Sequence, residues 1–308
     1  SIKANVYSAS LAAAISGGPS IAVSGGGAFA NNVIYGDTLA YIDGSTATVA
    51  GDVDLEAMNT SAIKAEVIAL SASVAISGST GVGIALGVSV ANNLIGGGGL
   101  LHIDEEGTKT VTNLGIDPMQ VQAYVKDSTV NAGGSLEVDA LSNQTIDATA
   151  AVATVSLSLG GKVSVAAAAA GTFATNLIRT DVASEILRST VTLGTGADLD
   201  AHDQSTIDAY AGSAAVSAAL APISAGISFA GTFANNEITN TVRSSIKGGS
   251  VSTQSGDVTA HASSAPEMNV KADAAALAAS IVAVAGAGIG STAKITNTVE
   301  SFADGAVI

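Results

Sequence analysis

The chain has 308 residues, of which 47% are hydrophobic but only 3% aromatic, so Ala and Val supply most of its apolar surface. The lack of cysteine excludes disulfide scaffolds, thiol catalysis and cysteine-held metals. A formal net charge of −15 with only 11 basic residues argues against binding to nucleic acid or to anionic lipid. Small apolar residues together with 35 Gly favour backbones that approach closely in thin, stacked sheets.

One repeat organises the whole chain into a single array. Ala4, Ala65, Ala148 and Ala209 occupy equivalent positions, so the common repeat is about 61 residues long. The second repeat is longer, and we place its insertion at residues 99–120. Because the chain begins inside the repeat pattern, we expect it to be a piece of a longer protein. The predicted repeats cover approximately residues 1–61, 62–144, 145–205, 206–266 and, as a partial copy, 267–308.

Each repeat opens with a stretch almost free of charge, which we expect to form two strands. In residues 81–90 large aliphatic side chains alternate with Gly, Ala and Ser, which is the period of a β-strand. Turn residues at 17–20, 78–81 and 160–162 divide the stretch and predict a hairpin-like reversal. The small-residue face should let a second sheet approach closely. We expect the aliphatic face to be buried against neighbouring repeats.

Paired Asn residues follow the second strand of this apolar stretch. Asn side chains hydrogen-bond along a stack of strands and tolerate turn conformations. We therefore interpret them as structural columns that end the long apolar strand, with ligand binding as the alternative role. The residues concerned are Asn31, Asn32, Asn92, Asn93, Asn176, Asn235 and Asn236.

The second half of each repeat carries most of the acids and has the pattern of short strands separated by Gly, as in residues 128–140. Short strands that turn at fixed positions are what a stacked coil requires. We therefore predict an all-β fold, a parallel β-helix or β-solenoid of about five repeats with tightly packed Ala-, Gly- and Ser-rich strand layers. The sequence leaves open whether one repeat forms one large coil or about three smaller ones.

A resemblance to a protein family lies in this second half. Residues 42–53, 128–134 and 249–258 are similar to the repeats of large filamentous-haemagglutinin-like and leukotoxin-like secreted proteins. The likeness spans all five repeats and is one of repeat style, without a short diagnostic motif. It implies a β-helical surface or secreted protein, located outside the cell or on a bacterial cell surface.

Clustered carboxylates raise the question of a calcium site. Alternating acids on a strand share one face and could hold Ca²⁺, but the sequence contains neither an EF-hand loop nor a nonapeptide calcium repeat. We interpret the acids as solvated faces, predict no cofactor and leave calcium as the open alternative. The clusters are residues 104–106, the group Asp52, Asp54 and Glu56, and the group Asp198, Asp200 and Asp203.

The sequence gives little support for a catalytic site. Asp147 and Asp208 could supply the carboxylate pair of a β-helical glycosidase, but the chain has no Trp and only five Phe and five Tyr to build a sugar cleft. Three His residues, His102, His202 and His261, show no metal-binding pair spacing and are interpreted as surface residues. We predict that the chain is not an enzyme.

These observations predict a non-catalytic structural or adhesive segment of a long extracellular surface protein or filament. The expected partners are other copies, through repeat stacking or strand edges, and a receptor on a cell surface or in the matrix. The alternative is a membrane-inserting or pore-forming toxin segment, because charge-free alternating strands resemble membrane-spanning β-segments.

Overall fold

The computed structural model describes residues 1–96, 100–103, 109–112 and 118–308. The described residues form twenty strands and no helix, and none of them belongs to a helix that could cross a membrane. All strand pairs among them are parallel except one short antiparallel pair. The predicted all-β class is confirmed, and the parallel sheets are consistent with a β-helix or solenoid-like fold.

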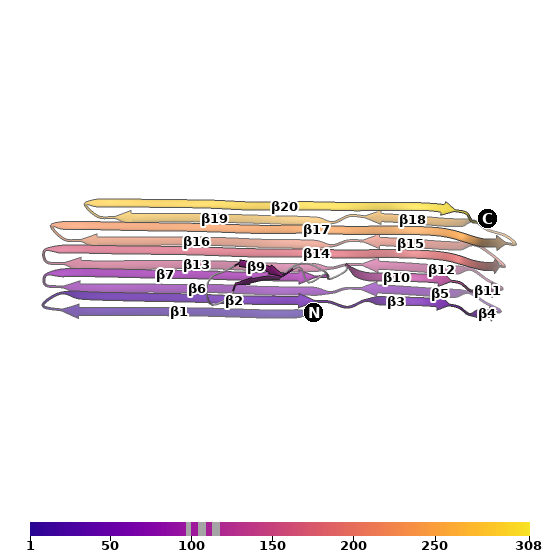
Figure 1. Cartoon of the computed structure of the whole chain (residues 1–308), viewed down its shortest axis with the longest axis horizontal. Helices are drawn as coiled ribbons and strands as arrows, with labels where there is room; N and C mark the ends of the chain where they lie inside the picture. The colour runs from indigo at the N-terminus through magenta and orange to yellow at the C-terminus, as the bar shows by residue number, and fades with distance from the viewer. Residues whose placement is uncertain (97–99, 104–108, 113–117) are drawn as a thin grey trace.

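Two sheets of long strands make up most of the molecule (Figure 1). The first sheet has the strand order β1 (Ile2–Ser16), β6 (Ala62–Ser77), β13 (Thr145–Gly160), β16 (Thr206–Leu220) and β19 (Glu267–Ala279). The long strands of the second sheet are β2 (Ser20–Ile34), β7 (Thr80–Ile95), β14 (Val163–Leu193), β17 (Ile223–Thr253) and β20 (Val282–Asp304), paired in that order.

Shorter strands complete the path between the long ones. Along the C-terminal half of β14 the second sheet also contains β3 (Thr38–Asp43), β4 (Thr46–Val49), β10 (Met119–Lys126) and β11 (Thr129–Ala132). A third sheet has the order β18 (Val258–Ser264), β15 (Ala197–Asp203), β12 (Leu136–Ser142) and β5 (Val53–Asn59). An antiparallel pair, β8 (Leu100–Ile103) and β9 (Lys109–Thr112), lies within the predicted insertion.

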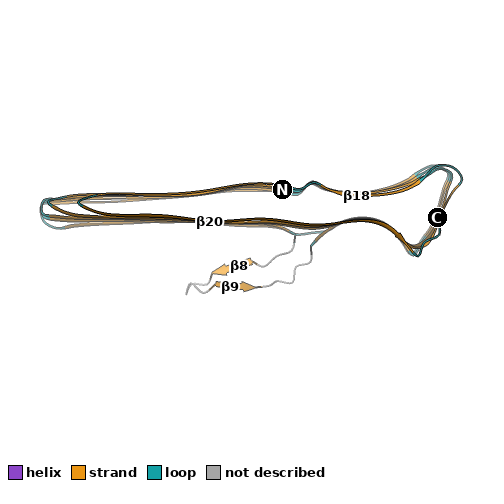
Figure 2. Ribbon diagram, turned by 90° about the horizontal axis from the view of Figure 1, so that it is seen from above, coloured by secondary structure: helices purple, strands orange, loops and turns teal. Residues whose placement is uncertain are grey.

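Equivalent residues of successive repeats lie side by side on neighbouring strands. Ile2 pairs with Ile63, and the buried amides of Asn32 and Asn93, 61 residues apart, are in direct contact. Seen from above, the strands superimpose on one outline (Figure 2). The chain therefore follows the same path once per repeat, which decides between the two alternatives left open by the sequence in favour of one large turn of chain.

Figure 2 shows a long, narrow part that widens into a three-sided end. In the narrow part, here named the flat section, the first sheet faces β2, β7 and the N-terminal halves of β14, β17 and β20. The three-sided end, here named the triangular section, is bordered by the rest of the second sheet, by β4 and β11, and by the third sheet.

The predicted hairpin-like reversal is wrong in one respect. The turn between β1 and β2 reverses the chain, but β1 pairs with β6 and β2 pairs with β7. The turn thus joins two facing sheets and not two hydrogen-bonded neighbours. The reason is that each strand finds a full-length, in-register parallel partner one repeat away.

The core changes in side-chain size along the molecule. In the flat section the buried residues are almost all Ala, such as Ala69, Ala150 and Ala215. In the triangular section they include bulky residues such as Leu136, Ile186 and Leu199. Small side chains let two sheets approach closely, whereas Leu and Ile fill the wider space between three sheets.

The space around the inward glycines shows how closely the two sheets approach each other in the flat section. A Cβ added at Gly26 would lie 2.6 Å from the backbone oxygen of Leu70, and one at Gly83 would lie 3.0 Å from that of Leu157. Both carbonyls belong to the facing sheet. The predicted small-residue layer between sheets is therefore present.

The prediction that the aliphatic face would be buried against neighbouring repeats is wrong. In β7, Leu86 and Val88 are exposed, whereas Ala85 and Ser89 are fully buried between the sheets. The same orientation holds for Leu70 of the first sheet and for Phe233 of β17. Neighbouring repeats stack edge to edge along the hydrogen-bonding direction, so they cover strand edges and leave the sheet faces uncovered.

Candidate functional site

The inner member of each predicted Asn pair belongs to a buried ladder between the two sheets. Asn32 Nδ2 donates to Asn93 Oδ1 at 2.8 Å, Asn93 Nδ2 donates to Asn176 Oδ1 at 2.8 Å, and Asn176 Nδ2 donates to Asn236 Oδ1 at 2.7 Å. All four side chains are buried, and Asn176 and Asn236 are fully inaccessible. Within the ladder, neighbouring amides satisfy one another.

The outer members point to the other side of the second sheet. Asn92, Asn235 and Thr175, which stands where the third Asn would be, line an open groove of about 460 Å³ with Phe173 and Phe233. Asn31 is exposed at the same position of β2. The structure thus separates the two members of each pair onto opposite faces of one strand.

The expectation that the Asn pairs end the apolar strand is wrong for the later repeats. Strand β14 continues from Asn176 to Leu193, and β17 continues from Asn236 to Thr253. Strands β2 and β7 end shortly after the pair, at Ile34 and Ile95. The amides fit inside continuous strands because the ladder pairs their side chains with one another.

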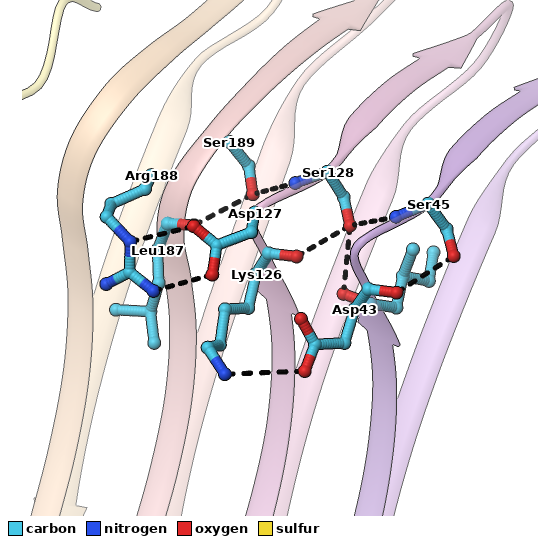
Figure 3. Close-up of polar contacts among 9 residues, drawn as sticks. Asp43, Ser45, Lys126, Asp127, Ser128, Leu187, Arg188 and Ser189 are labelled. Atoms are coloured by element: carbon cyan, nitrogen blue, oxygen red, sulfur yellow. Dashed lines mark hydrogen bonds and ion pairs between the residues drawn. The ribbon is translucent and has the colours of Figure 1, made fainter.

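A corner of the triangular section brings charged residues of neighbouring strands together (Figure 3). Arg188 makes a bidentate ion pair with Asp127, at 2.8 and 2.7 Å, and Lys126 Nζ lies 3.3 Å from Asp43 Oδ2. Above the Lys126–Asp43 pair in this view, the backbone N–H of Ser45 donates to the hydroxyl of Ser128. The Arg188 guanidinium holds the pKa of the Asp127 carboxyl below its usual value.

This corner needs a left-handed backbone in every repeat. Asp127 and Arg188 both have φ of 47°, and the equivalent Gly44, Gly248 and Gly305 have φ of 58°, 65° and 61°. Glycine adopts this conformation without steric cost, whereas a side chain makes it unfavourable. The ion pair thus joins the two repeats in which a residue other than glycine adopts this conformation.

The outer face of the third sheet carries an array of carboxylates. Register pairs Glu137 with Asp54 on one side and Asp198 on the other, and it pairs Asp139 with Glu56 and Asp200 in the same way. Partial burial, followed by the charges of its four acidic neighbours, raises the pKa of Asp139 to about 6. Asp52 lies apart from the array, where hydrogen bonds from Ser135 lower the pKa of its carboxyl.

No group of three or more His, Cys, Asp or Glu side chains among the described residues is arranged to hold a metal ion. The acids of the array project from a flat sheet surface and therefore do not surround a common point. The acidic cluster predicted at residues 104–106 lies outside the described residues, as do Gly99 of the insertion and the side chain of His102.

The candidate catalytic acids lie in one exposed column of the first sheet. Asp147 pairs with Lys64 at 2.6 Å, and Asp208 accepts a hydrogen bond from Asn269 at 3.0 Å. These are contacts between residues of neighbouring strands on an open face. His261 lies 3.2 Å from Asp200 on the exposed face of the third sheet, and His202 contacts Gln204 and Ser263.

Asp203 is the residue for which the interpretation as part of a solvated face is wrong. It is fully buried where the flat and triangular sections meet, and it accepts hydrogen bonds from Ser205, Asn240 and Ser264. Its position in the chain contains the signal for this: Asp198 and Asp200 share one face of β15, whereas Asp203 is an odd number of residues from both. Period-two counting would have placed it inside.

The sequence analysis did not predict that the outer face of the second sheet in the flat section has protruding aromatic side chains beside a groove. Phe173 and Phe233 stack with ring centroids 5.4 Å apart and stand up from the sheet. Beside them a second groove of about 610 Å³ is lined by Gly171, Gly231 and Gly288, with Leu86 and Phe229 on its far side. The signal was present as Gly-Thr-Phe, repeated at 171–173 and 231–233.

No family model, curated protein or solved structure matches this chain.

Proposed function

We propose that the chain is a β-solenoid segment of five coils that serves as a non-catalytic structural and adhesive part of a long extracellular surface protein or filament. The finer fold assignment is supported by the constant register between repeats and by the single outline seen in Figure 2. The extracellular location and the kinship with filamentous-haemagglutinin-like and leukotoxin-like proteins rest on the style of the repeats.

The observation that carries this proposal is that the outermost strand at each end of the stack is paired on one side only and leaves its other edge open. Strands β1 and β19 are the outermost strands of the first sheet, and β2 and β20 occupy the same places in the second. An open strand edge is a template for further pairing. Another repeat or another copy can therefore continue the stack, which gives the segment its function of building length.

A substitution at one open end tests this proposal. Ala274 points between the sheets in the last strand of the first sheet, whereas Ala275 points outward. Ala274→Lys is tolerated in a single copy because the amine can reach solvent through the open end, but it would be buried by a stacked copy. We expect the chain to form linear assemblies that lengthen with concentration, and Ala274→Lys to prevent them.

Sedimentation velocity and electron microscopy measure these assemblies, and Ala275→Lys is the matched control that should assemble normally. A chain that never associates end to end, or an Ala274→Lys variant that assembles like Ala275→Lys, would contradict the proposal.

Membrane insertion is the second candidate function, and the outward aliphatic side chains of the flat section favour it. Leu11, Leu70 and Val155 on the first sheet, and Leu86 and Phe229 on the second, give the flat section two apolar faces. Exposed apolar patches of this kind bind either proteins or membranes. Dye-loaded vesicles of neutral and of anionic lipid distinguish the two, because leakage caused by non-assembled chain would favour insertion over the structural role.

A further inference from the structure

The flat section ends in a part of the chain that is almost free of charge, here named the tip. In each repeat the tip is the segment where the chain turns from the first sheet to the second, namely residues 9–25, 70–86, 153–169, 214–229 and 275–286. Lys162 is the one charged residue of these segments. The β8–β9 hairpin projects beside the second sheet but does not reach the turns, and the acidic third sheet lies at the opposite end of the molecule (Figure 2).

The tip is apolar on both faces and at its edge. On the first sheet Leu70 and Val155 are each 48% exposed. On the second sheet Leu86 and Phe229 are exposed to the same degree, at 49% and 52%. The exposed aliphatic residues next to the turns, which join the two faces, are Ile15, Ile21, Leu220, Ile223, Ile281 and Val282.

This distribution indicates what covers the tip. A folded partner or a second copy of the chain covers one face of a sheet and leaves the opposite face in water. A fluid apolar phase surrounds both faces and the edge at once. We therefore propose that the tip binds lipid and attaches the assembled stack to a neutral bilayer by entering one leaflet.

The length of the tip fits one leaflet. From Ala9 to Ile15, and equally from Leu70 to Ile76, the first sheet extends about 20 Å at about 3.3 Å per residue. The hydrocarbon core of a bilayer is about 30 Å thick, so the tip is longer than one leaflet of the core and too short to cross it. The next columns of the first sheet away from the turns contain Asp273 and then Glu66, which stay outside the core.

The polar groups of the tip are satisfied inside the stack. Strands β6, β13 and β16 have parallel partners on both sides, so their backbone groups are paired as hydrocarbon requires. The hydroxyls of Ser24, Ser71 and Ser73 form hydrogen bonds in the space between the two sheets. The open edges of the end strands are the exception, and stacking of a further copy covers them. The lipid-binding role therefore rests on the proposed function.

Charge decides which lipid the tip enters. The net charge of −15 opposes contact with an anionic surface, whereas a neutral bilayer does not repel the chain. Lys162 lies in the turn of the third repeat and is costly to place inside a leaflet. We expect Lys162→Leu to raise the partition coefficient onto phosphatidylcholine vesicles at least about tenfold.

A matched pair of acidic substitutions on the first sheet tests the role of the tip. Val216→Asp places a carboxylate within the tip, and Thr149→Asp places the same charge on the same face outside it. In flotation with phosphatidylcholine vesicles, Val216→Asp should lower the partition coefficient at least about tenfold and Thr149→Asp should change it by less than about threefold. Circular dichroism and thermal melting would establish that both variants remain folded.

Tryptophan reporters test whether lipid surrounds both faces, because the parent chain contains no Trp. Val155→Trp reports on the first sheet, Phe229→Trp on the second, and Thr192→Trp on the triangular section. With vesicles, the emission of the first two should shift to the blue and be quenched by brominated acyl chains, while that of Thr192→Trp should not change. A response from one face alone would overturn the proposal.

Assembly is measured separately, by sedimentation velocity in buffer without lipid. A chain that assembles but does not float with neutral vesicles overturns the lipid-binding role alone, whereas a chain that does not assemble contradicts the proposed function. Leakage of dye caused by the assembled stack would contradict entry into one leaflet only. If Val216→Asp loses self-association in buffer, the tip binds another copy of the chain and the lipid-binding role is wrong.

Discussion

At the scale of single residues, the buried Asn side chains determine the register in which neighbouring repeats stack. The ladder from Asn32 to Asn236 places one amide in the buried interior of each of the first four repeats, where neighbouring amides satisfy one another and Asn236 Nδ2 donates to the backbone carbonyl of Thr292. A shift of register by one residue would replace these amides with outward side chains and leave them unpaired. The ladder therefore stabilises one register over its neighbours.

Asn176→Ala tests this role. The substitution leaves Asn93 Nδ2 without an acceptor and Asn236 Oδ1 without a donor, so we expect the free energy of unfolding to fall by about 1–3 kcal/mol. Thr175→Ala, on the exposed side of the same strand, is the control and should change it by less than about 0.5 kcal/mol. Chemical denaturation measures both, and equal effects would contradict a special role of the ladder.

Asp139 predicts a dependence of stability on pH. Its folded-state pKa of about 6 lies above the ordinary value for Asp, so the folded chain binds a proton that the unfolded chain has lost. This group therefore lowers stability as pH rises from about 4 to about 6, and its full penalty is present above pH 6.

Asp139→Asn removes the penalty. We expect the thermal midpoint of this variant to exceed that of the parent at pH 7.5, and the two midpoints to converge below about pH 4, where Asp139 is protonated in both the folded and the unfolded chain. Glu56→Gln, at the edge of the same column, is a comparison with a weaker expected effect. If the difference between the thermal midpoints of the parent and of Asp139→Asn is the same at every pH, the crowding of carboxylates has no energetic consequence.

At the scale of single strands, residues point alternately inward and outward, and this determines which positions tolerate a larger side chain. Gly26 and Gly25 are neighbours in β2, yet a Cβ at Gly26 would lie 2.6 Å from a carbonyl of the facing sheet, whereas one at Gly25 would meet no atom within 4 Å. Two residues of the same type thus have opposite tolerance to substitution.

Gly26→Ala should force the facing sheets apart and lower the free energy of unfolding by about 1–3 kcal/mol. Gly25→Ala should leave it unchanged or raise it slightly, because Ala restricts the unfolded chain more than Gly does. Thermal melting of both variants is the measurement. If Gly25→Ala proves the more damaging substitution, the assignment of inner and outer faces is wrong.

Stability should vary along the stack at the scale of the whole molecule. Strands β13 and β14 have partners on both sides, whereas β1 and β19 have one. In stacked repeats each unit is stabilised by its neighbours, so end units open most easily. We expect backbone amides of β1 and β19 to exchange with deuterium faster than those of β13 in mass-spectrometric hydrogen exchange. Uniform protection from β1 to β19 would contradict this.

The sequence by itself determined the strands, the repeat and the small-residue layer. Alternation in residues 81–90 reports a two-faced strand, and the positions of Asn32, Asn93, Asn176 and Asn236 already contain the register that the structure shows. Both signals are local or periodic, so they can be recognised without coordinates.

Only the tertiary structure decided which face of each strand is outside. The alternation of large and small side chains shows that Leu86 and Ala85 lie on opposite faces of the strand. It does not show which of the two faces contacts the second sheet. The pairing of facing sheets through Ala, Gly and Ser uses the small face for the interior, and stacking along the hydrogen-bonding direction covers only edges. Leu86, Phe173 and Phe233 therefore remain exposed on the outer face of the second sheet.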